Sequence, residues 1–525
     1  MAKTILFTDA IIHTMQEDYP LASSMLVQKG RIVALDPRNV KRAKIVSLKG
    51  QHVYPCLIDS HLHLLPTLVA FTGFKLSTIT EGKVLPSTLK GVENKIREFS
   101  SKVKKGELVI ITNYIITAIK EQRLPTKEEL DLWCDNKAVA IYTIDGHSSA
   151  LSTKMLEKLS INTVGHIGIL QGIEHESIQG RLTNLIASSV TVKMLAKGVA
   201  GFHNACAKYG ISAVGALEGN GDSEKDLTTK LIIQLARRFK VSVYLYLQYF
   251  DIKKALPLIK YQATPRLGGC GDWEMDGAIG AHSAAFSTPY KDTGKIAKVY
   301  KTQKDVDKTV QEANSLGFQI ASHAIGEEAI KLIVKAFSTI KDEKTNRIEH
   351  CEFPTDKEIE EISKHNYALV MQPGYSWLDK RYLHTYSQFL STDTLKQLKL
   401  KTLFDKNIIV CGSSDSPVQD LDPWFQMMGM KEYYNEEESI SNYEALKSYT
   451  VNAAKALRAE EDRGQLKVKA VADFFTSKQD IFTLSAQELC DFRPKDTYYG
   501  GKVTKTLKSN IVGFLLIIFN KPHKI

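Results

Sequence analysis

Hydrophobic and polar residues alternate over three segments near the N-terminus, and glycine turns follow the apolar runs. The segments are ILFTDAIIHTM at 5–15, SSMLVQKGRIVAL at 23–35 and AKIVSLKGQHVYP at 43–55. Such alternation predicts short strands. Similar segments recur near the far end, at 470–478 and 497–507. We therefore expect residues 1–54 and 460–525 to form one small β-sandwich domain.

The middle of the chain alternates between apolar, strand-like runs and amphipathic, helix-like runs. Helical periodicity is clear, for example, at 305–317 and 356–366. Eight strands alternating with helices predict an α/β fold, a (β/α)8 TIM-like barrel over residues 55–459. The eight candidate strands are 56–64, 211–217, 241–248, 273–281, 318–324, 346–352, 367–373 and 408–415.

Two segments do not fit a plain barrel. The interval at about 66–210 is too long for one crossover between neighbouring strands, so it predicts an inserted lid or subdomain. Its apolar runs at 108–115 and 138–151 are candidate strands. The apolar run IVGFLLIIF at 511–519 is too short to span a bilayer, and it predicts a terminal strand or a docking segment.

Composition narrows the class of protein. The 525 residues are 43% hydrophobic and 24% charged, as in ordinary soluble globular proteins. The net charge of +10 comes from scattered lysines without arginine–aromatic interleaving, which indicates a solvated surface and no nucleic-acid groove. Seven cysteines stand singly, without a CxxC pair, and the first residues lack a secretory h-region. We expect a cytoplasmic protein without a membrane partner.

Polar side chains stand where the candidate strands end. His61 and His63 close the first strand, His323 the fifth, His350 the sixth and Asp415 the eighth. The C-terminal strand ends of a barrel converge at one face, so these five side chains should meet. Imidazoles and carboxylates are ligands of a divalent ion such as Zn²⁺. Each residue alone has a plainer role in a core or a turn; the joint pattern predicts a metal site.

Several motifs resemble one known family. The segments PCLIDSHLHL (55–64), SHAIGEEAI (322–330), RIEHCEF (347–353) and GSSDSPV (412–418) resemble the amidohydrolase superfamily, and more closely its YtcJ-like branch of metal-dependent hydrolases, the amidohydrolase 3 type. The likeness extends to DGHSSALSTKML at 145–156 and covers the chain from about residue 3 to 508.

The resemblance implies a metal-dependent hydrolase of a non-peptide C–N bond, in an amide or a cyclic amide. His61, His63 and Asp415 would bind the more buried metal, and His323 and His350 a second. One or two divalent ions per chain are expected, with Zn²⁺ as the metal. A metal-activated hydroxide would attack the carbonyl carbon, while Asp415 accepts the proton and passes it to the leaving nitrogen.

The segment GDWEMDGAIGAH at 271–282 departs from the branch. Its members usually place a carboxylated, bridging lysine four residues before the DG pair, where this chain has Asp272. Even spacing would put Asp272, Glu274, Asp276 and His282 on one strand face. We expect Glu274, nearer the rim, to bridge the metals. Asp272 as the ligand and a single-metal site stay open, and Asp276 fits the turn itself.

Substrate contacts and two rival functions complete the expectations. Candidate contacts of the small-molecule substrate are His147, His282, Tyr375, Trp377 and Arg381. The alternative for His147 is a contact that supports other site residues, for His282 a plain rim position, and for the other three an exposed loop position. The runner-up function is a single-metal deaminase of a nitrogen heterocycle, with Glu327 or Glu328 as the proton shuttle. A non-catalytic scaffold ranks last, because all five core ligands are present. Association into a homo-oligomer is compatible with the sequence.

Overall fold

The computed structural model describes residues 4–80, 83–104, 106–219, 221, 226–341, 344–507 and 509–525. Its central sheet has eight strands, each paired in parallel with the next in the order β6-β14-β15-β16-β17-β18-β19-β20. A parallel bridge between Leu62 and Ser416 joins the two ends, so the sheet forms a nearly closed barrel. The strands are β6 (Leu57–Leu62), β14 (Ile211–Glu218), β15 (Ser242–Leu247), β16 (Arg266–Glu274), β17 (Gln319–Ala324), β18 (Arg347–His350), β19 (Ala368–Met371) and β20 (Ile409–Gly412).

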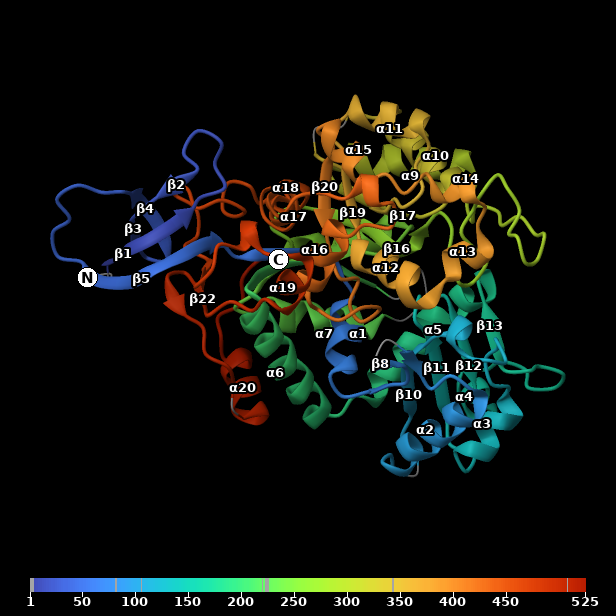
Figure 1. The fold of residues 1–525 in the computed structure, drawn as a ribbon. Coiled ribbons are helices and arrows are strands. Elements are labelled where there is room, and N and C mark those ends of the chain that lie inside the picture. Colours follow the sequence, from blue (N-terminus) through green and yellow to red (C-terminus); the bar gives the residue numbers. More distant parts are fainter. Residues whose placement is uncertain are drawn as a thin grey trace.

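Helices lie outside this sheet and cover it (Figure 1). The amphipathic runs predicted at 305–317 and 356–366 are helices α9 and α11. The (β/α)8 prediction is therefore confirmed. The principal covering helices are α6 (Val192–Tyr209), α7 (Leu227–Ala236), α9 (Gln303–Ser315), α10 (Glu327–Phe337), α11 (Asp356–Ser363), α15 (Leu400–Asp405), α16 (Pro423–Lys431), α17 (Asn442–Tyr449) and α18 (Val451–Ala456).

The fourth barrel strand is not where the apolar pattern placed it. The prediction of 273–281 is wrong, because β16 covers Arg266–Glu274. Its glycines mark close backbone approaches: a Cβ on Gly268 would lie 1.9 Å from the Ala321 carbonyl oxygen, and one on Gly269 would lie 2.1 Å from the Leu217 side chain. The sequence of this glycine-rich run resembles a loop, but in the structure the run is a strand in a crowded part of the barrel.

A bulge in β16 also removes the strand face assumed for Asp272, Glu274, Asp276 and His282. Gly269 pairs with Ser322 and Glu274 pairs with His323, so 270–273 have no counterparts on β17. Since alternation fails across these residues, even spacing does not place them on one face. Asp276 and His282 lie beyond the strand altogether.

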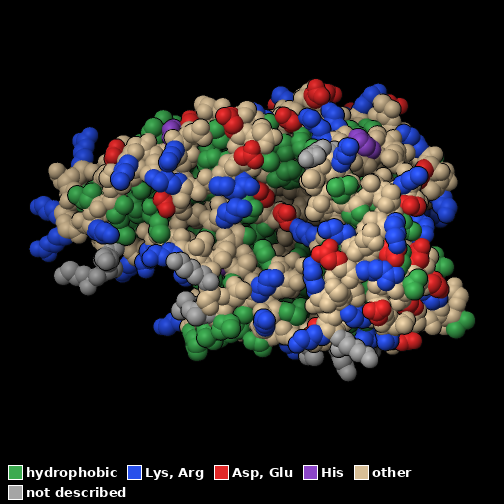
Figure 2. Space-filling model, turned by 60° about the horizontal axis from the view of Figure 1, so that its bottom comes forward, with side chains coloured by type: hydrophobic (Ala, Val, Ile, Leu, Met, Phe, Trp, Pro, Cys, Tyr) green, Lys and Arg blue, Asp and Glu red, His purple; other side chains and the backbone are tan. Residues whose placement is uncertain are grey.

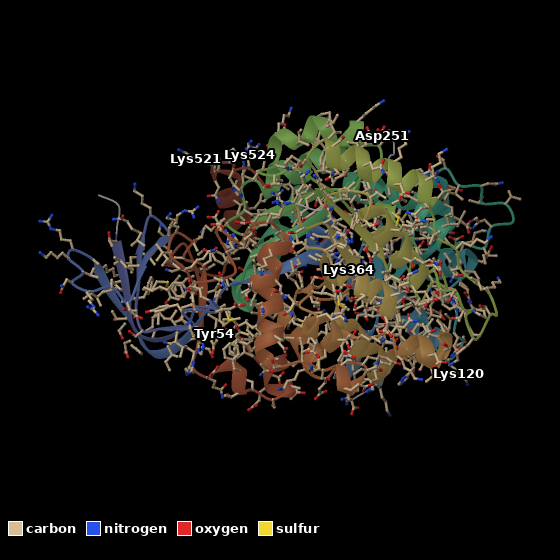
Figure 3. The ribbon with its side chains drawn as sticks, turned by 90° about the horizontal axis from the view of Figure 1, so that it is seen from above. Tyr54, Lys120, Asp251, Lys364, Lys521 and Lys524 are labelled. Atoms are coloured by element: carbon tan, nitrogen blue, oxygen red, sulfur yellow. The ribbon has the colours of Figure 1, made fainter. Side chains whose placement is uncertain are left out.

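Strands from both ends of the chain share one mixed sheet, in the order β23-β22-β21-β5-β1-β3-β4 with β2 beside β1. Tyr54 lies where this sheet meets the rest of the molecule (Figure 3), and its hydroxyl donates to Asp480 Oδ1 at 2.8 Å. The predicted domain boundaries themselves stay a prediction. The strands are β1 (Thr4–His13), β2 (Leu21–Ala22), β3 (Met25–Gln28), β4 (Arg31–Leu35), β5 (Lys44–Pro55), β21 (Phe474–Ser477), β22 (Asp496–Tyr499) and β23 (Lys502–Val503).

The segment between β6 and β14 contains a second sheet with its own apolar core, in the order β13-β12-β11-β10-β7. The strands predicted at 108–115 and 138–151 are β10, β11 and β12. In Figure 1 this insertion lies beside the barrel, at the lower right. Its elements include β7 (Phe74–Lys75), β10 (Val109–Tyr114), β11 (Val139–Thr143), β12 (Ser148–Leu151), β13 (Ile169–Gln171), α2 (Leu89–Ser101), α3 (Lys127–Trp133), α4 (Thr153–Lys158) and α5 (Ile173–Ser189).

The apolar run near the C-terminus is helix α20 (Asn510–Ile518), packed against α6. A docking segment is thus the correct prediction and a terminal strand is wrong, because the run packs helically on α6 instead of pairing at a sheet edge. Phe514 and Ile517 are buried, while Ile511 and Phe519 are exposed. Figure 2 shows hydrophobic side chains gathered at the lower edge of the face that it draws. Among the described helices none alone is long and apolar enough to cross a membrane; α5 and α6 pass only as a pair, bent by 105°.

Candidate active site

His61, His63 and Asp415 meet where β6 and β20 end. Asp415 Oδ1 lies 3.2 Å from His61 Nε2 and 3.4 Å from His63 Nε2. Ligand atoms of one tetrahedral zinc ion, each about 2.0–2.1 Å from the metal, stand about 3.3 Å apart. The same Oδ1 is buried and receives no hydrogen bond from the described residues. The spacing of this trio is therefore compatible with one divalent ion, and its assignment as a ligand set stays a prediction.

His323 and His350 lie beside this trio. A cysteine contacts both of these histidines and also His61 of the trio. Cys270 Sγ, on β16, is 3.8 Å from His61 Nε2, 4.0 Å from His323 Nδ1 and 3.9 Å from His350 Nε2. Sequence reasoning missed Cys270, because it is one of several single cysteines and stands in a run that resembles a loop. The one signal in the sequence was the crowding of glycines around it, at 268, 269 and 271.

The outward nitrogen of each of these three imidazoles has its own partner. His61 Nδ1 lies 2.7 Å from Glu349 Oε2, His350 Nδ1 lies 2.8 Å from Gln372 Oε1, and His323 Nε2 lies 3.4 Å from the Gly277 carbonyl oxygen. A ring that donates outward turns the lone pair of its other nitrogen inward, as metal ligation requires. The sequence did not reveal Glu349 or Gln372 as these partners.

Glu349 is held in turn by a buried arginine. Arg347 Nε and Nη2 each donate to the Glu349 carboxylate at 2.8 Å, and Nη2 also donates to the Ser60 carbonyl oxygen at 2.9 Å. Burial alone would raise the pKa of Glu349, but the charges of Arg347 and His61 lower it to about 2. The carboxylate is therefore ionised where it supports His61.

The three carboxylates of the fourth strand and its exit have different surroundings. Glu274 lies within reach of Cys270 and His323, and its Oε2 is buried without a hydrogen-bond donor among the described residues. Burial, and then the charge of Glu176, raise the pKa of Glu274 well above its usual value. Asp272 lies against Gly221 and belongs to none of the metal-capable groups in the described chain. Asp276 accepts three backbone N–H bonds, from Ala285, Ile325 and Gly326, and so fixes the loop.

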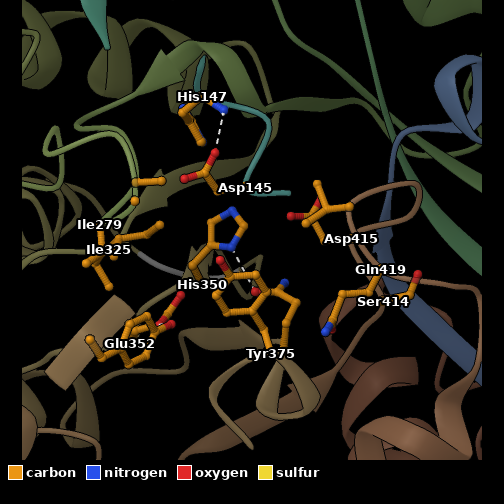
Figure 4. Close-up of a pocket in the computed structure, with 15 residues that line it drawn as sticks. Asp145, His147, Ile279, Ile325, His350, Glu352, Tyr375, Ser414, Asp415 and Gln419 are labelled. Carbon is orange, nitrogen blue, oxygen red and sulfur yellow. Dashed lines mark hydrogen bonds between the residues drawn. The ribbon is translucent and has the colours of Figure 1, made fainter. Parts of the chain in front are cut away.

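A pocket opens beside the cluster, between the barrel and the insertion (Figure 4). The insertion contributes His147, whose Nδ1 lies 2.7 Å from Glu176 Oε1 and whose ring centre is 5.4 Å from that of His323. Burial opposes the charged form of His147, but Glu176 raises its pKa to about 10. The pocket is lined by Asp145, His147, Ala278, Ile279, Gly280, Ile325, His350, Glu352, Gln372, Tyr375, Tyr386, Ser414, Asp415, Val418 and Gln419.

Of the predicted substrate contacts, His147 and Tyr375 line this pocket, and the other three do not. His282 pairs with Asp292 at 2.8 Å and its ring centre lies 4.2 Å from that of Phe389. Trp377 and Arg381 both bond Glu432.

The two carboxylates suggested as a deaminase proton shuttle do not line the pocket, and each bonds other residues. Glu327 accepts from the Ser287 backbone and from Gln397, and Glu328 pairs with Lys331 on the surface.

A comparison with known protein families identifies the family of this chain. The family model described as "Amidohydrolase family" matches residues 44–505. The chain belongs to this amidohydrolase family. Family membership supports a hydrolase with a small-molecule substrate, and it indicates a divalent metal.

Individual relatives match across nearly their whole length. The chain is 22% identical to "Putative amidohydrolase YtcJ" of Bacillus subtilis, covering 94% of this chain and 97% of that protein. It is 21% identical to "N-substituted formamide deformylase" of Arthrobacter pascens, covering 95% and 98%. A solved "uncharacterized metal-dependent hydrolase" of Pyrococcus horikoshii has a TM-score of 0.71 at 20% identity, covering 92% of this amidohydrolase and 99% of that chain. The structural likeness supports the barrel fold.

Proposed function

We propose that this amidohydrolase cleaves a non-peptide C–N bond, in an amide or a cyclic amide, with one or two bound divalent ions, Zn²⁺ being expected. The observation that carries the proposal is the convergence of four imidazoles and Asp415 at one end of the barrel. Three of those imidazoles turn an unshared nitrogen inward. The relative named N-substituted formamide deformylase fits the same substrate class.

The cluster divides into two sets of possible metal ligands. His61, His63 and Asp415 would hold the first ion, and His323 and His350 the second, with Glu274 or another residue of the fourth strand between them. When bound, such an ion acidifies water and polarises a carbonyl oxygen. The buried carboxylate oxygens Asp415 Oδ1 and Glu274 Oε2 are suited to a cation.

Asp415 is placed to move the proton. Its carboxylate both lines the pocket and contacts the imidazoles of His61 and His63. Burial would raise its pKa, but His61 above all, and then His63, hold it well below its usual value. The ionised carboxylate would accept a proton from the attacking water and deliver it to the leaving nitrogen.

His147 would bind the substrate oxygen. Its neighbour Glu176 keeps the imidazole protonated, since the pKa of His147 is raised to about 10 against the effect of burial. A protonated ring at the pocket wall can donate a hydrogen bond to a carbonyl oxygen on which charge develops.

The pocket lining favours a neutral or cationic substrate. Asp145, Glu352 and Asp415 contribute carboxylates, and no lysine or arginine is among the described residues that line the pocket. Burial raises the pKa of Glu352 to about 7, so this group too is partly ionised near neutral pH. A substrate carboxylate would find no lysine or arginine among the described lining residues, and the protonated His147 already pairs with Glu176.

The test compares substrates and one variant of the metal-loaded enzyme. We expect neutral N-substituted amides or cyclic amides to be hydrolysed with higher kcat/KM than N-acyl amino acids of the same size. The substitution Asp415→Asn should lower kcat by about 10²–10⁴-fold, the usual contribution of a general acid or base. Metal content and circular dichroism report whether the site and the fold persist.

The matched control is Asp393→Asn, since Asp393 is a surface carboxylate paired with Lys396. This variant should keep full activity. Ammonia release from amino-heterocycles without any amide hydrolysis would replace the proposal with a deaminase. The cytoplasmic location and a homo-oligomer stay predictions.

A further inference from the structure

The Cys270 thiol is the group that both predicted metal sets share. Its sulfur contacts His61 from the first set, at 3.8 Å, and His323 and His350 from the second, at 4.0 and 3.9 Å. We propose that the Cys270 thiolate is the fourth-strand ligand that bridges two divalent ions. This inference rests on the proposed function, because it names a ligand of the same site.

The distances fit coordination to shared ions. For one tetrahedral zinc ion, with Zn–S about 2.3 Å and Zn–N about 2.0–2.1 Å, sulfur and nitrogen stand about 3.6 Å apart. The observed contacts of 3.8–4.0 Å exceed this by only a few tenths of an ångström. An ion on each side of the sulfur therefore needs only a small inward shift of the rings.

Hydrogen bonds can satisfy only part of this cluster. The outward nitrogens of His61, His323 and His350 are already engaged, so three inward nitrogens face one sulfur. His61 Nε2 can donate to Asp415 Oδ1, 3.2 Å away. A neutral thiol carries one weak donor, so it can serve only one of the two remaining lone pairs, on His323 Nδ1 and His350 Nε2. Independently, Glu274 Oε2 is buried without a hydrogen bond from the described residues, and Glu274 is only 7% exposed. Cations would satisfy all of these atoms together.

Glu274 reaches only one side of the cluster. Its carboxylate groups with Cys270 and His323, and separately with His147 and Glu176, whereas Cys270 also groups with His61 and His350. Its Oε1 accepts the Gly271 N–H at 2.9 Å. This position suits a terminal ligand of the second ion better than a bridge.

The bulge in β16 explains how so short a side chain reaches the centre. Residues 270–273 are extra to the pairing with β17, and glycines on both sides of Cys270 have positive φ, +107° at Gly269 and +64° at Gly271. Such a bulge turns a side chain that regular alternation would place elsewhere. A long, carboxylated lysine can reach the ions from deep in a barrel; here the backbone itself brings the thiol to them.

The test reads the ligand from the spectrum of the Co²⁺-substituted full-length protein. A thiolate bound to Co²⁺ gives an intense near-ultraviolet charge-transfer band that imidazole and carboxylate ligands do not give. We expect wild type to bind about two Co²⁺ per chain with this band, as in two-metal hydrolases. Cys270→Ser should lose the band and about half of the Co²⁺, while the set of His61, His63 and Asp415 retains the rest. Glu274→Gln and Asp272→Asn are the matched variants and should keep the band.

Each outcome separates the two proposals. A Co²⁺-loaded wild type without the band, or a Cys270→Ser variant that keeps it, overturns the thiolate bridge. Since the wild-type band needs no variant, and Cys270→Ala offers a second substitution, a misfolded serine variant does not prevent the test. Wild type that shows the band but hydrolyses no amide overturns the proposed function alone. Wild type that binds no Co²⁺ overturns both.

Discussion

A single carboxylate, Glu349, connects a buried arginine to the imidazole of His61. Glu349 Oε2 lies 2.7 Å from His61 Nδ1, and the same carboxylate receives two bonds from Arg347. Both residues are fully buried. A carboxylate behind a ligating imidazole fixes the ring and makes it a stronger ligand. Glu349 is therefore expected to govern metal affinity without touching the metal.

Replacing Glu349 by glutamine tests this positioning role. We expect the affinity of the apoprotein for Zn²⁺ to fall by about 10–100-fold, measured by competition with a chelator. The free energy of unfolding of the apoprotein should also fall, by about 3–5 kcal/mol, because Arg347 loses its buried counter-charge. The surface pair of Glu361 and His365, at 3.2 Å, provides the control. Glu361→Gln should change neither quantity, and wild-type Zn²⁺ affinity in Glu349→Gln would contradict the role.

At the scale of elements, strand β16 depends on residues without a side chain. Gly268 and Gly269 have φ of +96° and +107°. A Cβ on either would lie within 2.1 Å of another barrel strand, β17 for Gly268 and β14 for Gly269. A side chain at Gly269 would press on the buried Leu217 of β14, which is separated from β16 by β15 in the sheet. These glycines therefore permit both the strand and the bulge that carries Cys270.

The substitution Gly269→Ala should destabilise the barrel strongly. Left-handed strain and overpacking together cost about 2–6 kcal/mol in the free energy of unfolding, measured with denaturant. Gly317 is the matched control, since its φ is +84° and nothing lies within 4 Å of the position that an added methyl group would occupy. Gly317→Ala should cost about 1 kcal/mol, the strain alone. Equal costs at the two positions would show that strand packing at Gly269 is not limiting.

At the scale of the whole molecule, helix α20 brings the far end of the chain onto α6. Its buried residues Phe514 and Ile517 join the main apolar core, while Phe519 is 81% exposed. The helix thus adds apolar contact to α6, the helix that leads directly into barrel strand β14.

A pair of phenylalanines tests the contribution of this packing. Phe514→Ala should lower the free energy of unfolding by about 3–5 kcal/mol, since it removes a buried ring. Phe519→Ala, in the same segment, should stay within about 0.5 kcal/mol of wild type, as surface substitutions do. Thermal unfolding of the two variants beside wild type gives the comparison. A similar loss in both would mean that the segment acts through its exposed face.

Much of the fold and part of the site could be predicted from local patterns. Apolar runs separated by amphipathic segments determined the barrel, because each strand and helix must bury its own apolar face. The strand ends then placed His61, His63, His323, His350 and Asp415 together, since parallel strands end at one rim. None of this needed knowledge of distant contacts.

The fourth strand could be decided only by tertiary structure. By sequence alone its glycines indicate a loop. Only the structure shows that Ala321 and Leu217 lie too close to Gly268 and Gly269 for any side chain there. The bulge that follows places Cys270 among three imidazoles, a position that no spacing rule gives. Glu349 as the partner of His61 depends on β18 and β6, which are not neighbours in the sheet, and Gln372 as the partner of His350 depends on the adjacent β19 and β18. Local patterns therefore determined which strands carry the site, and the packing of strand against strand decided which side chains complete it.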